Sequence, residues 1–273
     1  MKIHPLFATA LLVLTACAPH AAAQNEAQDA TVQPLALQVG SPTVETLDFS
    51  FRPGNIQPGT RVHLLISGFS QKIVKLNDDD STLSSVADST GKDLLAETPK
   101  EDDAFSFTSG PFGSFPRIND DGDLMIIELI APQAPAPGAT HISYQGELSI
   151  MLSAGTQTVN AKNIALTPGD IQLGEQSITL KSFGPSDWQE GKSSLVLTTD
   201  PAWVDTIASW KITGPDGAEL SDGPNSSMTM TNSAQLDFIL DASPETVNIE
   251  VVLYDDVQNQ TLPLAFEMSL GVE

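Results

Sequence analysis

Cysteine is almost absent from this 273-residue chain, which has one, at position 17. A single cysteine has no partner for an internal disulfide bond, so the fold cannot depend on one. Long apolar runs are scarce as well. The stretch from Leu6 to Leu14 is apolar apart from Thr9 and is too short for a membrane-spanning helix. We interpret it as the apolar part of a signal peptide.

Basic residues are also scarce. Twelve Lys and Arg stand against 35 Asp and Glu, which gives a formal net charge of −23 and a pI near 4.2. Affinity for phosphates comes mostly from lysine and arginine, so this composition excludes nucleic acid as a partner and disfavours anionic lipid headgroups. Basic proteins and divalent cations remain compatible, although an acidic surface can also serve solubility alone.

Catalytic motifs are missing or incomplete. Gly191–Ser193 matches the end of a phosphate-binding loop, but Gly184 lies seven positions before Gly191, where five are required. The Ser-x-x-Lys spacing at 89–92 lacks the partner motifs of penicillin-binding enzymes, and no Gly-x-Ser-x-Gly or His-x-x-x-His is present. We expect no catalytic residues and no enzyme, and the alternative is a hydrolase that uses paired carboxylates.

The residues around the cysteine form a recognisable signal: Leu14, Thr15, Ala16 and Cys17 follow the apolar stretch directly. The segment resembles the signal peptides of bacterial lipoproteins, in which a leucine and two small residues precede a cysteine that receives lipid. The resemblance implies a signal peptide over residues 1–16, cleavage before Cys17, and a diacylglyceryl group on its sulfur, usually with a third acyl chain. Two or more acyl chains hold a protein on a membrane where one would release it.

Two further features bear on localisation. Ala18 after the cysteine implies, by the same resemblance, sorting to the outer membrane. Ala21 and Ala23 match instead the −3 and −1 positions of an ordinary secretory cleavage site before Gln24, which would release a soluble periplasmic protein. In either case residues 17–33 have no large apolar side chain except Val32, and they predict a flexible tether.

The body of the chain shows the period-two alternation of apolar residues that is typical of half-buried strands. The alternating sets are Leu35-Leu37-Val39, Leu47-Phe49-Phe51, Val62-Leu64-Ile66, Ile142-Tyr144, Leu148-Ile150-Leu152, Ile178-Leu180, Val247-Ile249-Val251 and Leu262-Leu264-Phe266. Glycine and proline turns separate them. The pattern predicts an all-β fold of two tandem antiparallel β-sandwich domains of the immunoglobulin-like type, over residues 34–154 and 155–273.

Helical patterns are short and few. Ser81 to Val86 is one candidate, with Ser81 as a possible cap. The other is Pro201 to Ser209, where Asp200 is suited to the N-cap position and Pro201 to the first helical position.

Two acidic loops are candidate calcium sites, because calcium prefers six to eight oxygen ligands. Their residues are Asn77, Asp78, Asp79 and Asp80 in the first loop, and Asn119, Asp120, Asp121 and Asp123 in the second. Neither loop has the full ligand series of an EF-hand, so a site would need ligands from elsewhere. The alternative is a pair of solvated turns.

Four phenylalanines crowd into one segment rich in glycine and proline: Phe105, Phe107, Phe112 and Phe115. An exposed apolar ledge here would bind a partner or lipid. The alternative, which we favour, is a long loop that folds back and buries these rings against the end of a sandwich.

These observations predict a non-catalytic envelope lipoprotein that acts as a binding or structural module. It would be attached to the membrane through lipid on Cys17, with an envelope protein as a possible partner and no cofactor except possible calcium. The alternatives are a soluble periplasmic or surface protein with calcium-assisted adhesion or partner binding, and the carboxylate-dependent hydrolase.

Overall fold

The structure is a computed structural model that describes residues 30–41, 57–96, 111–113 and 116–271. Strands account for 64% and helix for 3%, and the strand pairs are antiparallel, so the prediction of an all-β, sandwich-like fold is confirmed. The first part of the chain forms β1 (Thr31–Gly40), β2 (Gly59–Ser67), β3 (Lys72–Leu76), a 3-10 turn η3 (Asp78–Asp80), β4 (Thr82–Asp88), β5 (Arg117–Ile118) and β6 (Leu124–Ala131).

The second part begins with a strand of 25 residues, β7 (His141–Ala165), and ends with one of 24 residues, β15 (Thr246–Ser269). Between them lie β8 (Gly169–Leu173), β9 (Gln176–Pro185), β10 (Ser193–Thr199), α1 (Pro201–Val204), β11 (Ile207–Thr213), β12 (Glu219–Ser221), β13 (Ser226–Met230) and β14 (Ser233–Leu240).

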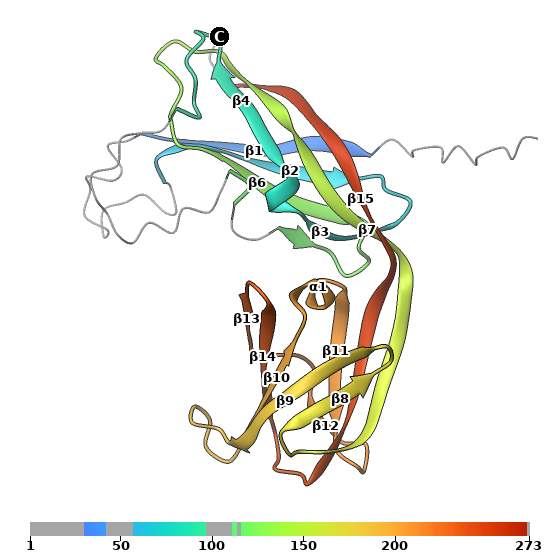
Figure 1. The fold of residues 1–273 in the computed structure, drawn as a ribbon. Helices are drawn as coiled ribbons and strands as arrows, with labels where there is room; N and C mark the ends of the chain where they lie inside the picture. The colour runs from blue at the N-terminus through green and yellow to red at the C-terminus, as the bar shows by residue number, and fades with distance from the viewer. Residues whose placement is uncertain (1–29, 42–56, 97–110, 114–115, 272–273) are drawn as a thin grey trace, which may run out of the picture.

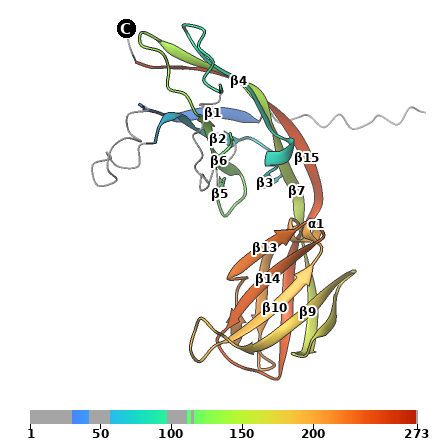
Figure 2. The ribbon, with the colours of Figure 1, turned by 60° about the vertical axis from the view of Figure 1, so that its left-hand side comes forward.

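Three sheets make two cores. A four-stranded sheet has the order β1-β2-β6-β5, a five-stranded sheet has the order β13-β14-β10-β9-β8, and a central sheet has the order β12-β11-β15-β7-β3, with β4 also paired to β7. One end of the central sheet packs against the four-stranded sheet to form the first core. Its other end packs against the five-stranded sheet to form the second core (Figures 1 and 2).

Strands β7 and β15 therefore form a two-stranded ribbon that runs through both cores. Their register extends from His141 opposite Ser269 to Ala165 opposite Thr246. At about 3.3 Å per residue, 25 residues follow a path on the order of 80 Å. Figure 1 shows the curved ribbon crossing from the upper body to the lower one.

The ribbon changes core near Ser153, whose hydroxyl lies 2.7 Å from the carbonyl oxygen of Asp255 on the partner strand. Asp256 has a φ of 49°, a left-handed conformation that costs energy for a residue with a Cβ. Beside this junction, Lys75 Nζ of β3 lies 2.8 Å from Asp205 Oδ2, which follows α1. The ion pair joins residues on the two sides of the junction.

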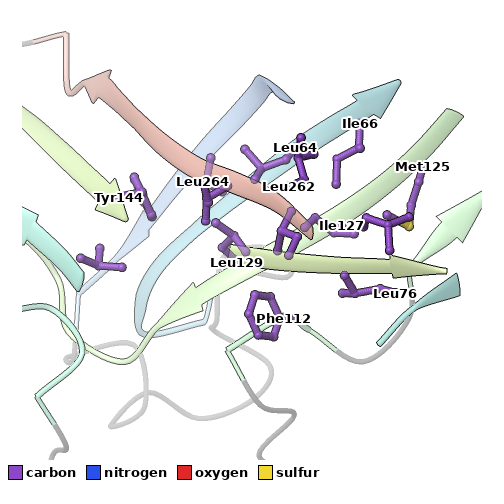
Figure 3. Close-up of a cluster of buried hydrophobic side chains, with 14 of the residues drawn as sticks. Leu64, Ile66, Leu76, Phe112, Met125, Ile127, Leu129, Tyr144, Leu262 and Leu264 are labelled. Carbon is purple, nitrogen blue, oxygen red and sulfur yellow. The ribbon is translucent and has the colours of Figure 1, made fainter. Parts of the chain in front are cut away.

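The end of β15 belongs to the first core. Leu262 and Leu264 are 7% and 1% exposed and pack with residues of β2, β6 and β7 (Figure 3). The sequence predicted that residues 155–273 form the second domain, whereas Leu262 and Leu264 belong to the first core. The difference arises because the pairing of β15 with β7 carries the chain back across the junction.

Two local predictions need correction. Thr31–Gln33 was assigned to the tether, but these residues open β1, where Thr31, Val32 and Gln33 lie opposite Ser67, Ile66 and Leu65. Pairing with β2 and packing of Val32 against the first core extend the strand to Thr31.

Ser81–Val86 was expected to be helical, but residues 82–88 form β4. Pairing with β7, which places Val86 opposite Tyr144, outweighs the local preference. The other helix begins as predicted: the side chain of Asp200 accepts a hydrogen bond from Ala202 N at 2.9 Å. It ends at Val204, because Ile207 onward pairs with β15.

Replacing Tyr144 by Phe is expected to leave the free energy of unfolding unchanged or to raise it by about 1 kcal/mol. Tyr144 is 2% exposed, and its ring stacks on Phe266 with centroids 4.7 Å apart. Its buried hydroxyl has no hydrogen-bond partner among the described residues, and burial raises the pKa of this phenol. Urea denaturation measures the effect, with Tyr254→Phe as the control, and a loss above 1 kcal/mol would contradict the reasoning.

Candidate functional site

The first acidic loop is a 3-10 turn at the end of β3. The carbonyl of Asn77 accepts a hydrogen bond from Asp80 N at 3.2 Å, and the Asn77 side-chain amide donates one to Asn259 Oδ1 at 3.0 Å. Partial burial, followed by the charge of Asp79, raises the pKa of Asp78, while Lys75 opposes that rise. The loop thus has three consecutive carboxylates, of which Asp78 is influenced by the charge of Lys75.

The second acidic loop is closed by its own side chains. Asn119 Oδ1 accepts hydrogen bonds from Asp123 N at 3.1 Å and Leu124 N at 3.0 Å, and its amide donates to Asp123 Oδ1 at 2.6 Å. Gly122, with a φ of 73°, makes the bend, and its carbonyl accepts from Ile73 N at 2.7 Å. The side-chain oxygen of Asn119 is therefore committed to the turn.

The two loops lie at opposite ends of β3, since the first follows Leu76 and the second contacts Lys72 and Ile73. The structure does not bring them together. Among the described residues, no three His, Cys, Asp or Glu side chains converge as a metal site would require. Calcium binding by Asp78–Asp80 or Asp120–Asp123 stays a prediction.

Of the four clustered phenylalanines, Phe112 lies in the described part of the chain. It is 3% exposed and packs into the first core beside Leu129 (Figure 3). Burial, not an exposed ledge, is therefore the role of this ring. Phe105, Phe107 and Phe115 lie outside the described residues.

Cys17 and the rest of the leader also lie outside the described residues, so lipidation stays a prediction. Across the part of the chain that is described, no helix has the length and apolar character needed to cross a membrane.

A charged cluster on the outer face of β2 and β6 was not predicted. Arg61 Nη1 lies 3.1 Å from Glu128 Oε2, and His63 Nε2 lies 4.0 Å from Glu128 Oε1. Arg61 also donates to Gln57. These side chains flank a hollow of about 370 Å³ that His63, Arg117 and Glu128 help to line. The sequence does contain a sign of this cluster, because Arg61 and His63 alternate with the buried Val62 and Leu64 and so share the outer face of β2.

Asp88 is a second feature that was not predicted. This carboxylate is 5% exposed and accepts hydrogen bonds from Thr90 N (2.9 Å), Thr90 Oγ1 (2.6 Å), Lys92 N (3.1 Å) and Ala136 N (2.7 Å). Burial raises its pKa, but the hydrogen bonds from Thr90, Ala136 and Lys92 outweigh burial and lower the pKa to about 2. Asp88 fastens the turn after β4 to the loop before β7, which is a structural role.

The most exposed large apolar side chain of the described residues is Trp188, at 91%. It lies between β9 and β10. Beside this connection is a hollow of about 250 Å³, lined in part by Gln189, Lys192, Asp222 and Asp241. Tryptophan is enriched among the side chains that contribute most to binding at protein interfaces. We regard this end of the second core as the candidate binding site.

No protein-family model matches the chain, and no curated protein matches it. A solved chain from "Complete structure of manganese lipoxygenase of Gaeumannomyces graminis and partial structure of zonadhesin of Komagataella pastoris" aligns with 77% of this chain and 87% of its own length. The identity is 11% and the TM-score is 0.12. A similarity this low supports no inference about fold or function.

Proposed function

We propose that the chain is a non-catalytic envelope lipoprotein, held on the outer membrane by lipid on Cys17, that acts as a binding or structural module. The lipoprotein-like leader provides the attachment. The proposed role as a binding or structural module rests on the shared ribbon of β7 and β15, which joins two packed cores into one elongated body.

The direction of the chain supports this arrangement. The predicted tether leads into β1, which is the edge strand of the four-stranded sheet in the first core. The second core lies beyond the junction at Ser153 (Figure 1). A lipid anchor before β1 would therefore attach the molecule through its first core.

The groups with shifted pKa values also support a structural interpretation. Hydrogen bonds to a turn account for Asp88, and burial in the first core accounts for Tyr144. A perturbed pKa in a cleft would favour catalysis, whereas Asp88 holds a turn and the Tyr144 hydroxyl is packed inside the first core.

The test of attachment is mass spectrometry of the amino-terminal peptide from protein made in a diderm bacterium. We expect Cys17 to be the first residue, with acyl chains on its sulfur and amine, and the protein to fractionate with the outer membrane. The Cys17→Ala variant should lose the acyl mass and leave that fraction. An unmodified Gln24 as the first residue, or an intact leader in the soluble fraction, would overturn the proposal.

A matched control separates the two possible cleavage sites. Ala21→Glu together with Ala23→Glu removes the small residues that ordinary secretory cleavage needs and leaves Leu14–Cys17 intact. Lipidation and membrane attachment should be unchanged in this double variant. Failure of processing in it would favour release before Gln24.

A further inference from the structure

Trp188 lies at the end of the second core that is remote from the first core. Strand β10 begins at Ser193, just after the Trp188 connection, and ends at Thr199, just before α1. Asp205, next to α1, pairs with Lys75 of the first core, so the opposite end of β10 points away from it (Figures 1 and 2). The indole is therefore presented at one tip of the molecule.

The Trp188 connection is held in a defined conformation. Ser186 Oγ accepts hydrogen bonds from Trp188 N at 3.2 Å and Gln189 N at 3.1 Å. Ser186 N also donates a hydrogen bond to the Lys192 carbonyl oxygen at 2.9 Å, which joins the two ends of the loop. An exposed side chain on an ordered loop loses less conformational entropy on binding than one on a flexible loop.

The charges around Trp188 select the kind of partner. Asp187 and Glu190 flank it and are exposed, and Asp222 lines the adjacent hollow. Lys192 Nζ, the cation of that hollow, lies 2.8 Å from Asp241 Oδ1 and so is already paired. In the part of the chain that the structure describes, no cation pairs with Asp187, Glu190 or Asp222. The field at this tip therefore favours a cationic partner.

We propose that this tip binds a basic polypeptide segment. An arginine or lysine side chain of the partner stacks on the indole of Trp188 and pairs with Asp187, Glu190 or Asp222. Guanidinium and ammonium groups are attracted to the face of a tryptophan ring, and acidic neighbours strengthen that attraction. The inference names a partner for the binding role proposed above and rests on it. Its test does not require lipid on Cys17.

The test is a calorimetric titration of the full chain, purified in a non-ionic detergent, with a nona-arginine peptide at low and moderate ionic strength. We expect Trp188→Ala to weaken binding about 5-fold, in line with the loss of one cation–π contact at an exposed site. Trp188→Phe should recover part of the loss. Asp187→Asn with Glu190→Gln should weaken binding and reduce its dependence on salt.

The matched control is Glu147→Gln with Glu267→Gln, which removes the same number of charges from exposed positions in the first core. Binding by this control should stay within about twofold of the parent, since long-range charge alone is screened. Equal weakening by the control and the tip variants would show a diffuse polyanion effect and overturn the proposal. Unchanged binding by Trp188→Ala would also overturn it, as would Trp188-dependent binding of a neutral oligosaccharide or of a second copy in place of the peptide.

Discussion

Replacing Leu264 by Ala is expected to lower the free energy of unfolding by about 2 to 5 kcal/mol, the range for a leucine truncated in a packed core. Leu264 is 1% exposed and lies in the first core, although it is only nine residues from the end of the 273-residue chain. The reason is that β15 pairs with β7 back to Ser269. Urea denaturation at several protein concentrations measures the loss.

Thr261→Ala is the matched control, because Thr261 lies on the same strand and is exposed. Its effect should stay within about 0.5 kcal/mol. A chain that ends after Ala154 should fail to fold, because it lacks Leu262, Leu264 and the strand opposite β7. A cooperatively folded fragment 30–154 would show that the first core does not need β15.

Replacing Asp88 by Ala is expected to cost about 2 to 3 kcal/mol at neutral pH, since the change leaves three partly buried backbone N–H groups without their charged acceptor. Asp88 joins Thr90 and Lys92 to Ala136, 48 residues away. Thermal and urea unfolding measure the loss. The control is Asp216→Ala, whose carboxylate accepts one exposed hydrogen bond, from Ala218 N at 3.1 Å.

The contribution of Asp88 depends on pH in a defined direction. Its pKa is lowered from 3.8 to about 2 in the folded protein, so its stabilisation is complete above about pH 4 and is lost as the pH falls toward 2. The difference in stability between the parent and Asp88→Asn should therefore shrink between pH 5 and pH 2. A difference that stays constant over this range would show that the charge of Asp88 is not the stabilising feature.

The strands with strict alternation were predictable from the sequence. Val62, Leu64 and Ile66 are fully buried in β2, and Val247, Ile249 and Val251 are buried in β15, as their spacing indicates. Alternation works in β2 and β15 because one face of each strand lies on a core. It fails in β1, where Leu35 and Val39 are 47% and 42% exposed and the register shifts between Pro34 and Ala36.

The crossing ribbon was not predictable in the same way. Residues 154–158 read Ala-Gly-Thr-Gln-Thr and show no apolar alternation, yet they continue β7 from one core to the other. Their conformation depends on residues 252–256, about 100 positions along the chain. Pairing over that separation is set by the whole fold, which is why the expected boundary near Gly155 missed the return of β15.

The placement of the candidate site was not predictable from the sequence. The acidic composition left basic proteins and divalent cations as compatible partners, and the spacing of Asp88 and Thr90 is typical of a side-chain turn. The 91% exposure of Trp188 and its position at one tip depend on how β9 and β10 pack. Exposure of one tryptophan among three cannot be inferred from a sequence pattern.

The continuity of β7 and β15 has a mechanical consequence. A tensile load along the long axis crosses the junction near Ser153 through two covalent backbones, because both strands pass from one core to the other. Separating the two cores would require unpairing strands within one of them. Two domains joined by a single-chain linker can move apart while both stay folded. Force applied to one core is therefore expected to reach the other through paired backbone and not through a single-chain linker.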